Sequence, residues 1–284
     1  MSLINVGICG ASGKMGKALI RAVANNNKLN LAGALEHKTN SNVGKDSGVI
    51  ANIEATNVNI TSNTDKFFAE CDTVIDFSFA DASVDNIKAA MTHNCSYVLG
   101  TTGFNEVQIK QIKGFAKSIP IMHAANMSVG VNVALHYTEL LSKSLNEDYD
   151  VEIHEMHHRE KIDSPSGTAL ALGNAVANGR NIDLSEKSIK SRWGIEQPRK
   201  RGDIGFSTQR GGDVIGDHIV TFAGNGERLE IAHKATNRDV FANGAVRAVL
   251  WLKDKAPEYY NMKDVLGLNS VSYTHLTLPT ILLV

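Results

Sequence analysis

The sequence predicts an α/β protein in which a parallel sheet with helices on both faces is joined to a second, α+β domain. Between residues 3 and 126, short apolar runs alternate with segments of helical period, a pattern typical of a parallel sheet. After about residue 129 this alternation ends, and a long helical run leads into strands of period two. A chain of 284 residues is long enough for two such domains.

The first part of the chain contains predicted strands and predicted helices in alternation. Each strand is a short apolar run followed by turn residues, and each helix has apolar residues at helical spacing. Because such strands run parallel, we expect their carboxyl ends at one edge of the sheet, where open α/β sheets bind ligands. The predicted strands cover residues 3–9, 29–36, 71–78, 95–103 and 119–126, and the predicted helices cover 14–26, 81–94 and 105–118.

The second part of the chain has the pattern of an antiparallel α+β domain. Two apolar strands flank the pair Asn225-Gly226, which is a strong hairpin signal. The run from Ser164 to Thr168 reads as a helix start, with hydroxyl caps and a proline in the first turn, and we expect Gly179 to end that helix. The predicted elements are helices over 129–145, 164–179 and 238–254, strands over 150–157, 214–222 and 227–235, and a polar loop over 179–203.

We expect the last of these helices to return to the first domain. This divides the chain into a first domain of residues 1–128 and 239–269 and a second domain of residues 129–238. Residues 270–284 (SVSYTHLTLPTILLV) match neither pattern, and they are too short, and carry a proline, for a membrane span. We therefore predict that this segment is a tail foreign to the natural fold.

Composition and charge argue against several classes of partner. The net charge of −1 does not favour nucleic acid or an anionic membrane, so we expect neither. The cysteines Cys9, Cys71 and Cys95 are odd in number and far apart, which indicates buried free thiols in a reducing compartment. The sequence has no basic-then-apolar signal at its start and no apolar run of about 18 residues, so we expect a cytoplasmic protein.

A glycine-rich turn follows the first predicted strand and opens the first predicted helix. Its spacing, G-x-x-G-x-x-G, is a variant of the dinucleotide fingerprint, in which glycines let the backbone approach a pyrophosphate and the helix N-terminus offers free N–H groups. Such a turn alone is a weak signal, but Glu36 ends the second strand, where an acid binds ribose hydroxyls. We therefore predict a nucleotide site formed by Gly10, Ala11, Ser12, Gly13, Lys14 and Met15, with Gly16 following them.

The residues after Glu36 bear on the choice between NADH and NADPH. Glu36 favours the free ribose hydroxyl of NADH, whereas His37 and Lys38 offer a cation to the 2′-phosphate of NADPH. We expect the protein to use both cofactors with some bias toward NADH.

Two loops at the ends of later strands are predicted to line the nicotinamide. Backbone groups there could hold the nicotinamide amide, although ordinary strand-to-helix turns would have the same composition. The first loop comprises Gly100, Thr101, Thr102 and Gly103, and the second comprises Ala124, Ala125, Asn126, Met127 and Ser128.

The histidine-rich run EIHEMHHRE admits a metal interpretation. In a helix, His154, His157 and His158 would share one face, as a metal site requires. The alternation of Val151 and Ile153 with polar residues favours a strand, in which neighbouring histidines face opposite ways. No cysteine or carboxylate cluster completes a ligand set, so we predict no metal.

The helix start after this run predicts an anion site. A helix N-terminus at Ser166, Gly167 and Thr168, with Lys161 nearby, suits a carboxylate or a phosphate, although a merely capped helix explains the same residues. His157, with an ordinary histidine pKa near 6.5, could protonate a carbon or nitrogen as hydride arrives.

Together these motifs resemble the bacterial dihydrodipicolinate reductases, also called 4-hydroxy-tetrahydrodipicolinate reductases, of lysine biosynthesis. The resemblance covers roughly residues 3–269. Its most specific part is HHREKIDSPSGTA, and VGICGASGKMG, GTTGF, AANMSVGVN and KATNRDVFANGAVRA match in order and spacing. The family implies a Rossmann-like dinucleotide-binding domain made from both chain ends. It also implies an α+β substrate-binding domain whose mixed sheet assembles a homotetramer.

The resemblance also implies an activity and residue roles. The activity is the reduction, with NADH or NADPH, of the small cyclic dicarboxylate 4-hydroxy-tetrahydrodipicolinate to tetrahydrodipicolinate in the diaminopimelate route to lysine. His157 is implied as the general acid, and Lys161 as a cation that helps donate a proton or holds a carboxylate. The implied substrate-binding residues are His158, Ser166, Gly167, Thr168 and Thr102, with Arg238 near the cleft. The implied cofactor-binding residues are the glycine-rich turn, Glu36, and the loops that hold Gly100, Thr101 and Thr102 and Ala124 to Met127.

Two positions depart from the pattern of some family members. His37 stands where some members have arginine, which weakens the case for strong NADPH binding. Met127 stands where some have phenylalanine, and a soft apolar side chain should serve there.

Three other interpretations explain fewer of these residues. A Rossmann oxidoreductase for an amino-acid semialdehyde would share the glycine-rich turn but would not need His157 and His158 beside Ser166. A regulator that senses nucleotide would not need an intact proton donor. A metal hydrolase would require no cofactor and would lose activity to a chelator.

Overall fold

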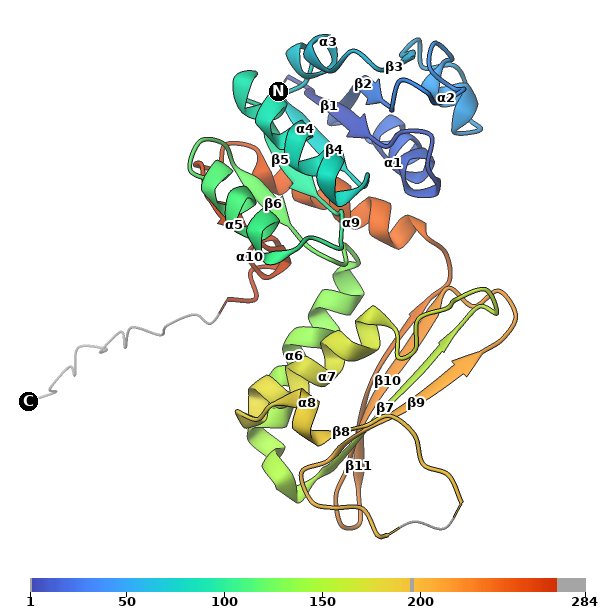
Figure 1. The fold of residues 1–284 in the computed structure, drawn as a ribbon, viewed down its shortest axis with the longest axis vertical. Coiled ribbons are helices and arrows are strands. Elements are labelled where there is room, and N and C mark those ends of the chain that lie inside the picture. The colour runs from blue at the N-terminus through green and yellow to red at the C-terminus, as the bar shows by residue number, and fades with distance from the viewer. Residues whose placement is uncertain (1, 195–196, 270–284) are drawn as a thin grey trace, which may run out of the picture.

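The structure, a computed structural model, has two lobes, each built on one sheet (Figure 1). It describes residues 2–194 and 197–269. The first lobe contains a seven-stranded sheet and the second a five-stranded sheet. The predicted tail over residues 270–284 lies outside the described residues, so its origin stays a prediction.

Every strand pair in the seven-stranded sheet is parallel. The strand order is β12-β6-β5-β4-β1-β2-β3. The carboxyl ends of β1 and β4, next to each other in the middle of this order, therefore lie at one edge, as predicted. The strands are β1 (Ile4–Cys9), β2 (Leu29–Leu35), β3 (Ile60–Thr61), β4 (Thr73–Asp76), β5 (Ser96–Leu99), β6 (Ile121–His123) and β12 (Tyr259–Tyr260).

Helices cover both faces of this sheet, which confirms the predicted α/β class. Leu19 of α1 and Val249 of α9 belong to one buried apolar cluster, whereas Ile87 of α4 and Ile112 of α5 belong to another. The late helix α9 packs against α1, so the chain returns to the first lobe (Figure 1). The helices are α1 (Lys14–Ala24), α2 (Ser47–Ile50), α3 (Thr64–Ala69), α4 (Ala80–Thr92), α5 (Glu106–Phe115), α9 (Asp239–Leu252) and α10 (Met262–Leu266).

The five-stranded sheet of the second lobe is mixed. Its order is β11-β10-β7-β9-β8, in which β10 pairs antiparallel with both neighbours while β9 pairs parallel with β7 and β8. Apolar residues of α6 and α7 form one buried cluster with Ile153 of β7 and Phe222 of β10. The elements are α6 (Val129–Leu145), the 3₁₀ helix η1 (Asn146–Asp148), β7 (Asp150–His157), α7 (Gly167–Arg180), α8 (Leu184–Lys187), β8 (Ser188–Ile189), β9 (Ile204–Arg210), β10 (Gly216–Ala223) and β11 (Arg228–Ala235).

The antiparallel interpretation of this region was wrong in part. The hairpin of β10 and β11 is confirmed, with a turn in which Gly224 N donates to Glu227 O at 3.0 Å. The parallel pairing arises because α7 crosses over between β7 and β9, so the chain re-enters the sheet in the same direction. The mixed sheet implied by the family resemblance is confirmed. The predicted loop over residues 179–203 also contains the short elements α8 and β8.

Helix α7 begins as predicted but ends later. Ser166 is the N-cap, and its hydroxyl accepts a hydrogen bond from Ala169 N at 3.2 Å, while Pro165 precedes the cap instead of lying in the first turn. Gly179 lies inside the helix, at a point where α7 packs closely against α6. A Cβ there would come within 2.4 Å of Glu139 O on α6, which explains the glycine. Its role is close helix packing, and Asn181, with φ of 55°, caps the helix instead.

Several short elements follow no strong pattern and were not predicted, namely α2, α3, α10, β3 and β12. The division of the chain at residues 128 and 239 stays a prediction. None of the helices formed by residues 2–194 and 197–269 combines the length and the apolar composition that crossing a membrane requires.

Candidate active site

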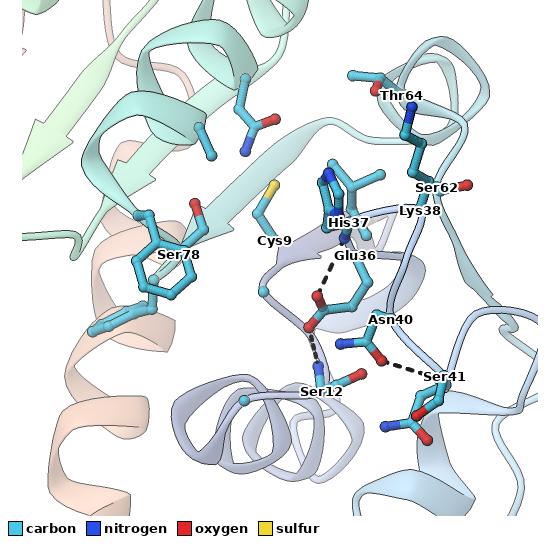
Figure 2. Close-up of a pocket in the computed structure, with 18 residues that line it drawn as sticks. Cys9, Ser12, Glu36, His37, Lys38, Asn40, Ser41, Ser62, Thr64 and Ser78 are labelled. Atoms are coloured by element: carbon cyan, nitrogen blue, oxygen red, sulfur yellow. Dashed lines mark hydrogen bonds between the residues drawn. The ribbon is translucent and has the colours of Figure 1, made fainter.

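A cavity of about 1020 Å³ lies at the carboxyl ends of β1 and β2 (Figure 2). The glycine-rich turn contributes Gly10, Ser12 and Gly13 to its lining. The segment after β2 contributes Glu36 and His37. The predicted pyrophosphate and ribose sites therefore line one hollow.

The glycine-rich turn requires glycine at two positions, for two different reasons. A Cβ on Gly16 would lie 2.1 Å from the carbonyl oxygen of Gly10 and 2.6 Å from that of Ala11. Gly10 has φ of +72°, a conformation that favours glycine. The helix thus starts directly behind the turn, with Gly13 as an N-cap that has no side chain to occupy the first N–H groups.

An unsatisfied polar atom in this turn tests whether it fits a dinucleotide. The Ser12 hydroxyl is buried and has no hydrogen-bond partner within the described part of the chain. A buried hydroxyl at a helix N-terminus suits a phosphate oxygen. The residues present therefore fit the pyrophosphate of NADH or NADPH.

The acid of the ribose site lies against this turn. Glu36 Oε1 accepts a hydrogen bond from Ser12 N at 2.7 Å, and Oε2 accepts one from His37 N at 3.3 Å (Figure 2). His37 Nδ1 is 2.8 Å from the Thr39 hydroxyl, and Lys38 also lines the cavity. Both the acid and the basic residues thus face the same cavity, and the NADH bias stays a prediction.

The loop after β5 uses its two threonines differently. Thr101 is buried, and its hydroxyl accepts from Ser83 Oγ at 2.9 Å, so its side chain belongs to the packed interior. Thr102 is exposed. A Cβ on Gly100 would lie 2.2 Å from the Phe77 ring, which explains the glycine there by packing. Gly100 N already donates to Asp76 O at 2.8 Å, so Gly100 can offer a ligand its carbonyl oxygen, Thr101 its N–H and Thr102 its side chain.

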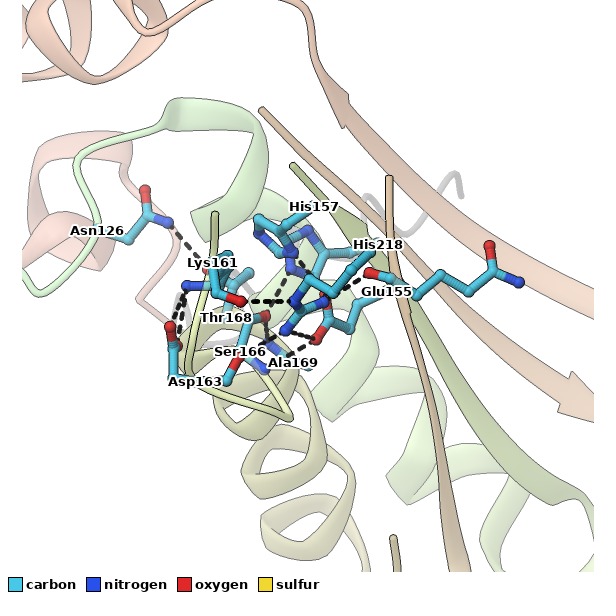
Figure 3. Close-up of polar contacts among 11 residues, drawn as sticks. Asn126, Glu155, His157, Lys161, Asp163, Ser166, Thr168, Ala169 and His218 are labelled. Carbon is cyan, nitrogen blue, oxygen red and sulfur yellow. Dashed lines mark hydrogen bonds and ion pairs between the residues drawn. The ribbon is translucent and has the colours of Figure 1, made fainter. Parts of the chain in front are cut away.

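The loop after β6 connects the two lobes. Ala124 and Ala125 lie at its start, and Met127 is buried against α9, where its carbonyl oxygen would be 1.8 Å from a Cβ on Gly244. Asn126 Nδ2 donates to the Thr168 hydroxyl of α7 at 3.2 Å (Figure 3). This contact brings together two residues that were predicted separately, one for the nicotinamide and one for the substrate.

Strand β7 confirms the period-two interpretation of the histidine-rich run. The side chains of Val151, Ile153, Glu155 and His157 are buried, while the residues between them are partly exposed. His158 follows the strand, and its backbone N–H donates to Val214 O at 2.7 Å. His157 and His158 therefore point in different directions.

Glu155 is the centre of a buried polar cluster (Figure 3). Its carboxylate, 1% exposed, lies 2.5 Å from His157 Nδ1 and accepts from Ser166 N at 3.0 Å. Arg210, at the end of β9, donates to both carboxylate oxygens at 3.0 and 3.1 Å. Burial alone would raise the pKa of Glu155, but the hydrogen bonds from Arg210 and His157 bring it below its ordinary value.

Burial lowers the pKa of both histidines of this cluster. Burial lowers the pKa of His157, and the hydrogen bond that the ring donates to Glu155 opposes that effect. Burial and the nearby His157 lower the pKa of His218 to about 4. The His157 and His218 rings meet edge to face with centroids 5.0 Å apart, and His218 Nε2 is 3.1 Å from the Ser166 hydroxyl.

Lys161 lies near His157 but is engaged with an acid. Its ammonium donates to both carboxylate oxygens of Asp163 at 2.7 and 2.8 Å, and this pairing lowers the pKa of Asp163 (Figure 3). The positive charge of Lys161 also helps to lower the pKa of His157. An anion that enters this region would compete with Asp163 for the ammonium.

The structure gathers His157, Lys161, Ser166 and Thr168 around the start of α7, with Gly167 exposed as its first residue. Thr102 and Arg238 are exposed, and neither side chain makes a hydrogen bond or ion pair with any residue the structure describes. Their predicted contact with substrate stays a prediction.

Comparison with known protein families matches almost the whole described chain. Residues 4–127 match the family described as dihydrodipicolinate reductase, N-terminus, and residues 130–266 match dihydrodipicolinate reductase, C-terminus. The chain belongs to the dihydrodipicolinate reductase family. This confirms the family predicted from the sequence, and with it an oxidoreductase that uses NADH or NADPH.

Individual dihydrodipicolinate reductases are similar over nearly their full length. The 4-hydroxy-tetrahydrodipicolinate reductase of Rhodopseudomonas palustris strain BisB18 is 42% identical, over 95% of this chain and 100% of the relative. That of Burkholderia lata is 44% identical, over 93% of this chain and 100% of the relative. The solved structure of dipicolinate-bound dihydrodipicolinate reductase from Paenisporosarcina sp. TG-14 has a TM-score of 0.73 at 24% identity, covering 91% and 97% of the two chains, and so shares the fold.

Three residues of the dihydrodipicolinate reductase site were missed at the level of sequence. Glu155 carried a signal, because in a strand it shares the buried face of Ile153 and His157, and a buried acid needs partners. Arg210 carried none, since it ends the unpredicted strand β9. His218 lies on a predicted strand, but its neighbours are set by the pairing of β10 with β7.

Proposed function

We propose that this protein reduces the cyclic dicarboxylate 4-hydroxy-tetrahydrodipicolinate, with His157 as the group that protonates the substrate ring. The family to which the chain belongs gives the activity: it is a 4-hydroxy-tetrahydrodipicolinate reductase of the diaminopimelate route to lysine, dependent on NADH or NADPH. The roles of individual residues are our proposal. When bound, the cofactor supplies the hydride.

The contact between His157 and Glu155 carries the assignment of the proton donor. Because Nδ1 is held by Glu155 at 2.5 Å, the proton that moves is the one on Nε2 of the charged ring. Nε2 makes no hydrogen bond with the residues of the described ranges, so it is left for a substrate. Burial lowers the pKa of His157 in the free protein, and a bound dianion would raise it again and load the ring with its proton.

The start of α7 is the proposed site for a substrate carboxylate. The hydroxyl of Ser166 and the N–H of Ser166 are already bonded within the protein. The Gly167 N–H faces the Asp163 carboxylate, so a substrate carboxylate would replace Asp163 there and add the N–H of Thr168. Lys161 and His158 are proposed to face the same charge. A carboxylate that takes the ammonium of Lys161 from Asp163 exchanges one ion pair for another, which limits the cost of desolvation.

On the cofactor side, the free Ser12 hydroxyl supports the glycine-rich turn as the pyrophosphate site. Glu36 is proposed to bind the adenine ribose, with His37 and Lys38 beside it. The loops at Gly100 to Thr102 and Ala124 to Met127 are proposed to hold the nicotinamide. The hydrogen bond from Asn126 to Thr168 fixes the second of these loops to the proposed carboxylate site.

We also propose that four copies of the chain associate through the second lobe. Helices α6 and α7 cover one face of its sheet. The other face presents Ile219 and Met156, both partly exposed, beside Thr221 of β10. Light scattering should give four times the chain mass, and a monomer would contradict the proposal.

The proposed compartment is the cytoplasm. Cys9, Cys71 and Cys95 are all buried and free, which suits a reducing environment.

The test of the proposed function is NADH oxidation with the cyclic substrate. We expect His157→Gln and Lys161→Ala each to reduce kcat/KM by about 10²-fold or more, as general-acid and electrostatic roles require. Matched controls are His136→Gln on α6 and Lys263→Ala. The Lys263 ammonium pairs with Glu139 at a distance of 3.0 Å and is not part of the proposed site. Near-normal turnover in both site variants would refute the mechanism.

A further inference from the structure

We infer that Glu155 and Arg210 are positioning residues that set the protonation of His157 in opposite directions and fix it to the start of α7. This inference rests on the proposed role of His157, and it adds two residues that are not proposed to touch the substrate and were not expected from the sequence. Glu155 is buried at 1% exposure and has all its contacts inside the protein.

The geometry makes Glu155 a bridge between two parts of the site. One carboxylate oxygen accepts from Ser166 N at 3.0 Å, and the other contacts His157 Nδ1 at 2.5 Å. Ser166 is the N-cap of α7, where the substrate carboxylate is proposed to bind. The proton donor and the anion site are thereby held at a fixed separation by one side chain.

Arg210 fixes the carboxylate and the loop in front of it. Its guanidinium reaches both oxygens of Glu155 and donates from Nε to Lys161 O at 3.2 Å. It also donates to the carbonyl of Asp163. A planar guanidinium with five donors can make this set of bonds at once, which a lysine cannot.

The charges that face His157 come from every element around it. Glu155 on its own strand favours the charged ring, whereas Arg210 on β9 and Lys161 in the following loop disfavour it. His218 on β10 packs edge to face against it and is itself held neutral. Gly216 lies beside the Nε2 edge of the ring, where a Cβ would be 3.0 Å from Nε2. Glu155 and Arg210 therefore act on the same imidazole with opposite sign.

Because Glu155 and Arg210 act with opposite sign, their removal should shift the pKa of His157 in opposite directions. A merely structural role would not produce that result. In cofactor-free and substrate-free protein, we would follow the His157 ring by NMR as a function of pH. Glu155→Gln removes the favourable charge and leaves Arg210 uncompensated, so the pKa of His157 should fall. Arg210→Gln removes an unfavourable charge, so the pKa of His157 should rise.

The kinetic counterpart is the pH profile of kcat with saturating NADH. In Glu155→Gln, the fall of kcat at high pH should move to lower pH, and kcat at neutral pH should be about tenfold lower. In Arg210→Gln, the fall of kcat should move to higher pH. Glu155→Asp keeps the charge and should restore part of the wild-type profile. Glu139→Gln, which breaks the ion pair with Lys263, is the control and should leave the profile unchanged.

Thermal unfolding establishes that each variant is folded. If Glu155→Gln does not fold, the comparison of Arg210→Gln with Glu155→Asp replaces it as the test. Shifts of the pKa in opposite directions support the inference. Unchanged pKa values, or shifts in the same direction, would overturn it. The proposed function fails separately, if His157→Gln keeps its activity.

Discussion

The turn after β1 and the cluster around Glu155 are both proposed to serve charged ligands, but they are made from different groups. The turn relies on the backbone. Gly10 and Gly16 let the start of α1 pack closely against the carbonyl groups of the turn, and α1 supplies N–H groups. The cluster relies on side chains, namely the buried Glu155 and His218 and the half-buried Arg210, brought together from β7, β9 and β10.

This difference predicts two kinds of sensitivity. A backbone site without spare volume should fail when atoms are added, and it should respond little to pH. A site of buried titratable groups should tolerate small changes of shape but respond strongly to changes of charge. The four predictions that follow test this contrast.

The largest effect should come from Gly16→Ala. The added Cβ would meet backbone oxygens at 2.1 and 2.6 Å, which cannot move without opening the turn. We expect a loss of stability of about 3 kcal/mol and no measurable binding of NADH, from chemical unfolding and fluorescence titration. Gly114→Ala on α5, where the Cβ meets open space, should instead stabilise the fold by about 1 kcal/mol. Normal NADH binding by Gly16→Ala would refute the backbone account.

The second effect is a dependence of stability on pH that arises in the second lobe. The pKa of His218 is about 4 in the folded protein and near 6.5 when unfolded, so the unfolded state binds the proton more readily. The contribution of His218 to the free energy of unfolding is therefore fully present above about pH 6.5, and it falls as pH decreases toward 4.

Between pH 7 and pH 5 the His218 contribution amounts to about 2 kcal/mol, from roughly 1.5 pH units at 1.36 kcal/mol each. Urea unfolding at the two pH values measures it. His218→Gln, which can still bond Ser166, should remove most of the slope, while the lowered pKa of His157 and of His233 leaves a remainder. The same slope in His218→Gln and wild type would contradict the assignment.

The third effect concerns the choice of cofactor. Glu36→Gln removes the charge that is proposed to bind the ribose hydroxyls, so we expect Kd for NADH to rise about tenfold, the size of one charged hydrogen bond. NADPH should be affected less, because the same charge repels its 2′-phosphate. Calorimetry with both cofactors measures this. A strong preference of the wild type for NADPH would contradict the predicted NADH bias.

The smallest effect should come from the contact between the lobes. Asn126→Ala removes a neutral hydrogen bond to Thr168 of 3.2 Å, worth about 1 kcal/mol. We expect KM for the cyclic substrate to rise about fivefold with kcat nearly unchanged. A fall in kcat with unchanged KM would mean that Asn126 serves the chemical step instead.

The same contrast explains what the sequence could predict. The turn after β1 is local: Gly10, Gly16 and the following helix are consecutive, and Glu36 lies one helix and one strand further on. Period and spacing were enough to find them. The strand β7 was also predicted by its alternation, which separated His157 from His158.

The rest of the second site depends on pairing across long stretches of chain. Arg210 reaches Glu155 because β9 pairs parallel with β7. The sequence of residues 204–210 contains no pattern that predicts this pairing. Gly179 looked like a helix stop and is instead a point of close packing on α6. The family resemblance supplied the mixed sheet and the role of His157, but it gave no account of the groups that hold His157 in place.

The most direct test of the account is a crystal structure of the protein with NADH and pyridine-2,6-dicarboxylate, an aromatic analogue of the substrate. We predict that one carboxylate lies at the N–H groups of Gly167 and Thr168, that Lys161 has turned from Asp163 toward the ligand, and that His157 Nε2 faces the ring while Glu155 keeps Nδ1. A ligand bound away from α7, or a His157 ring that has left Glu155, would contradict it.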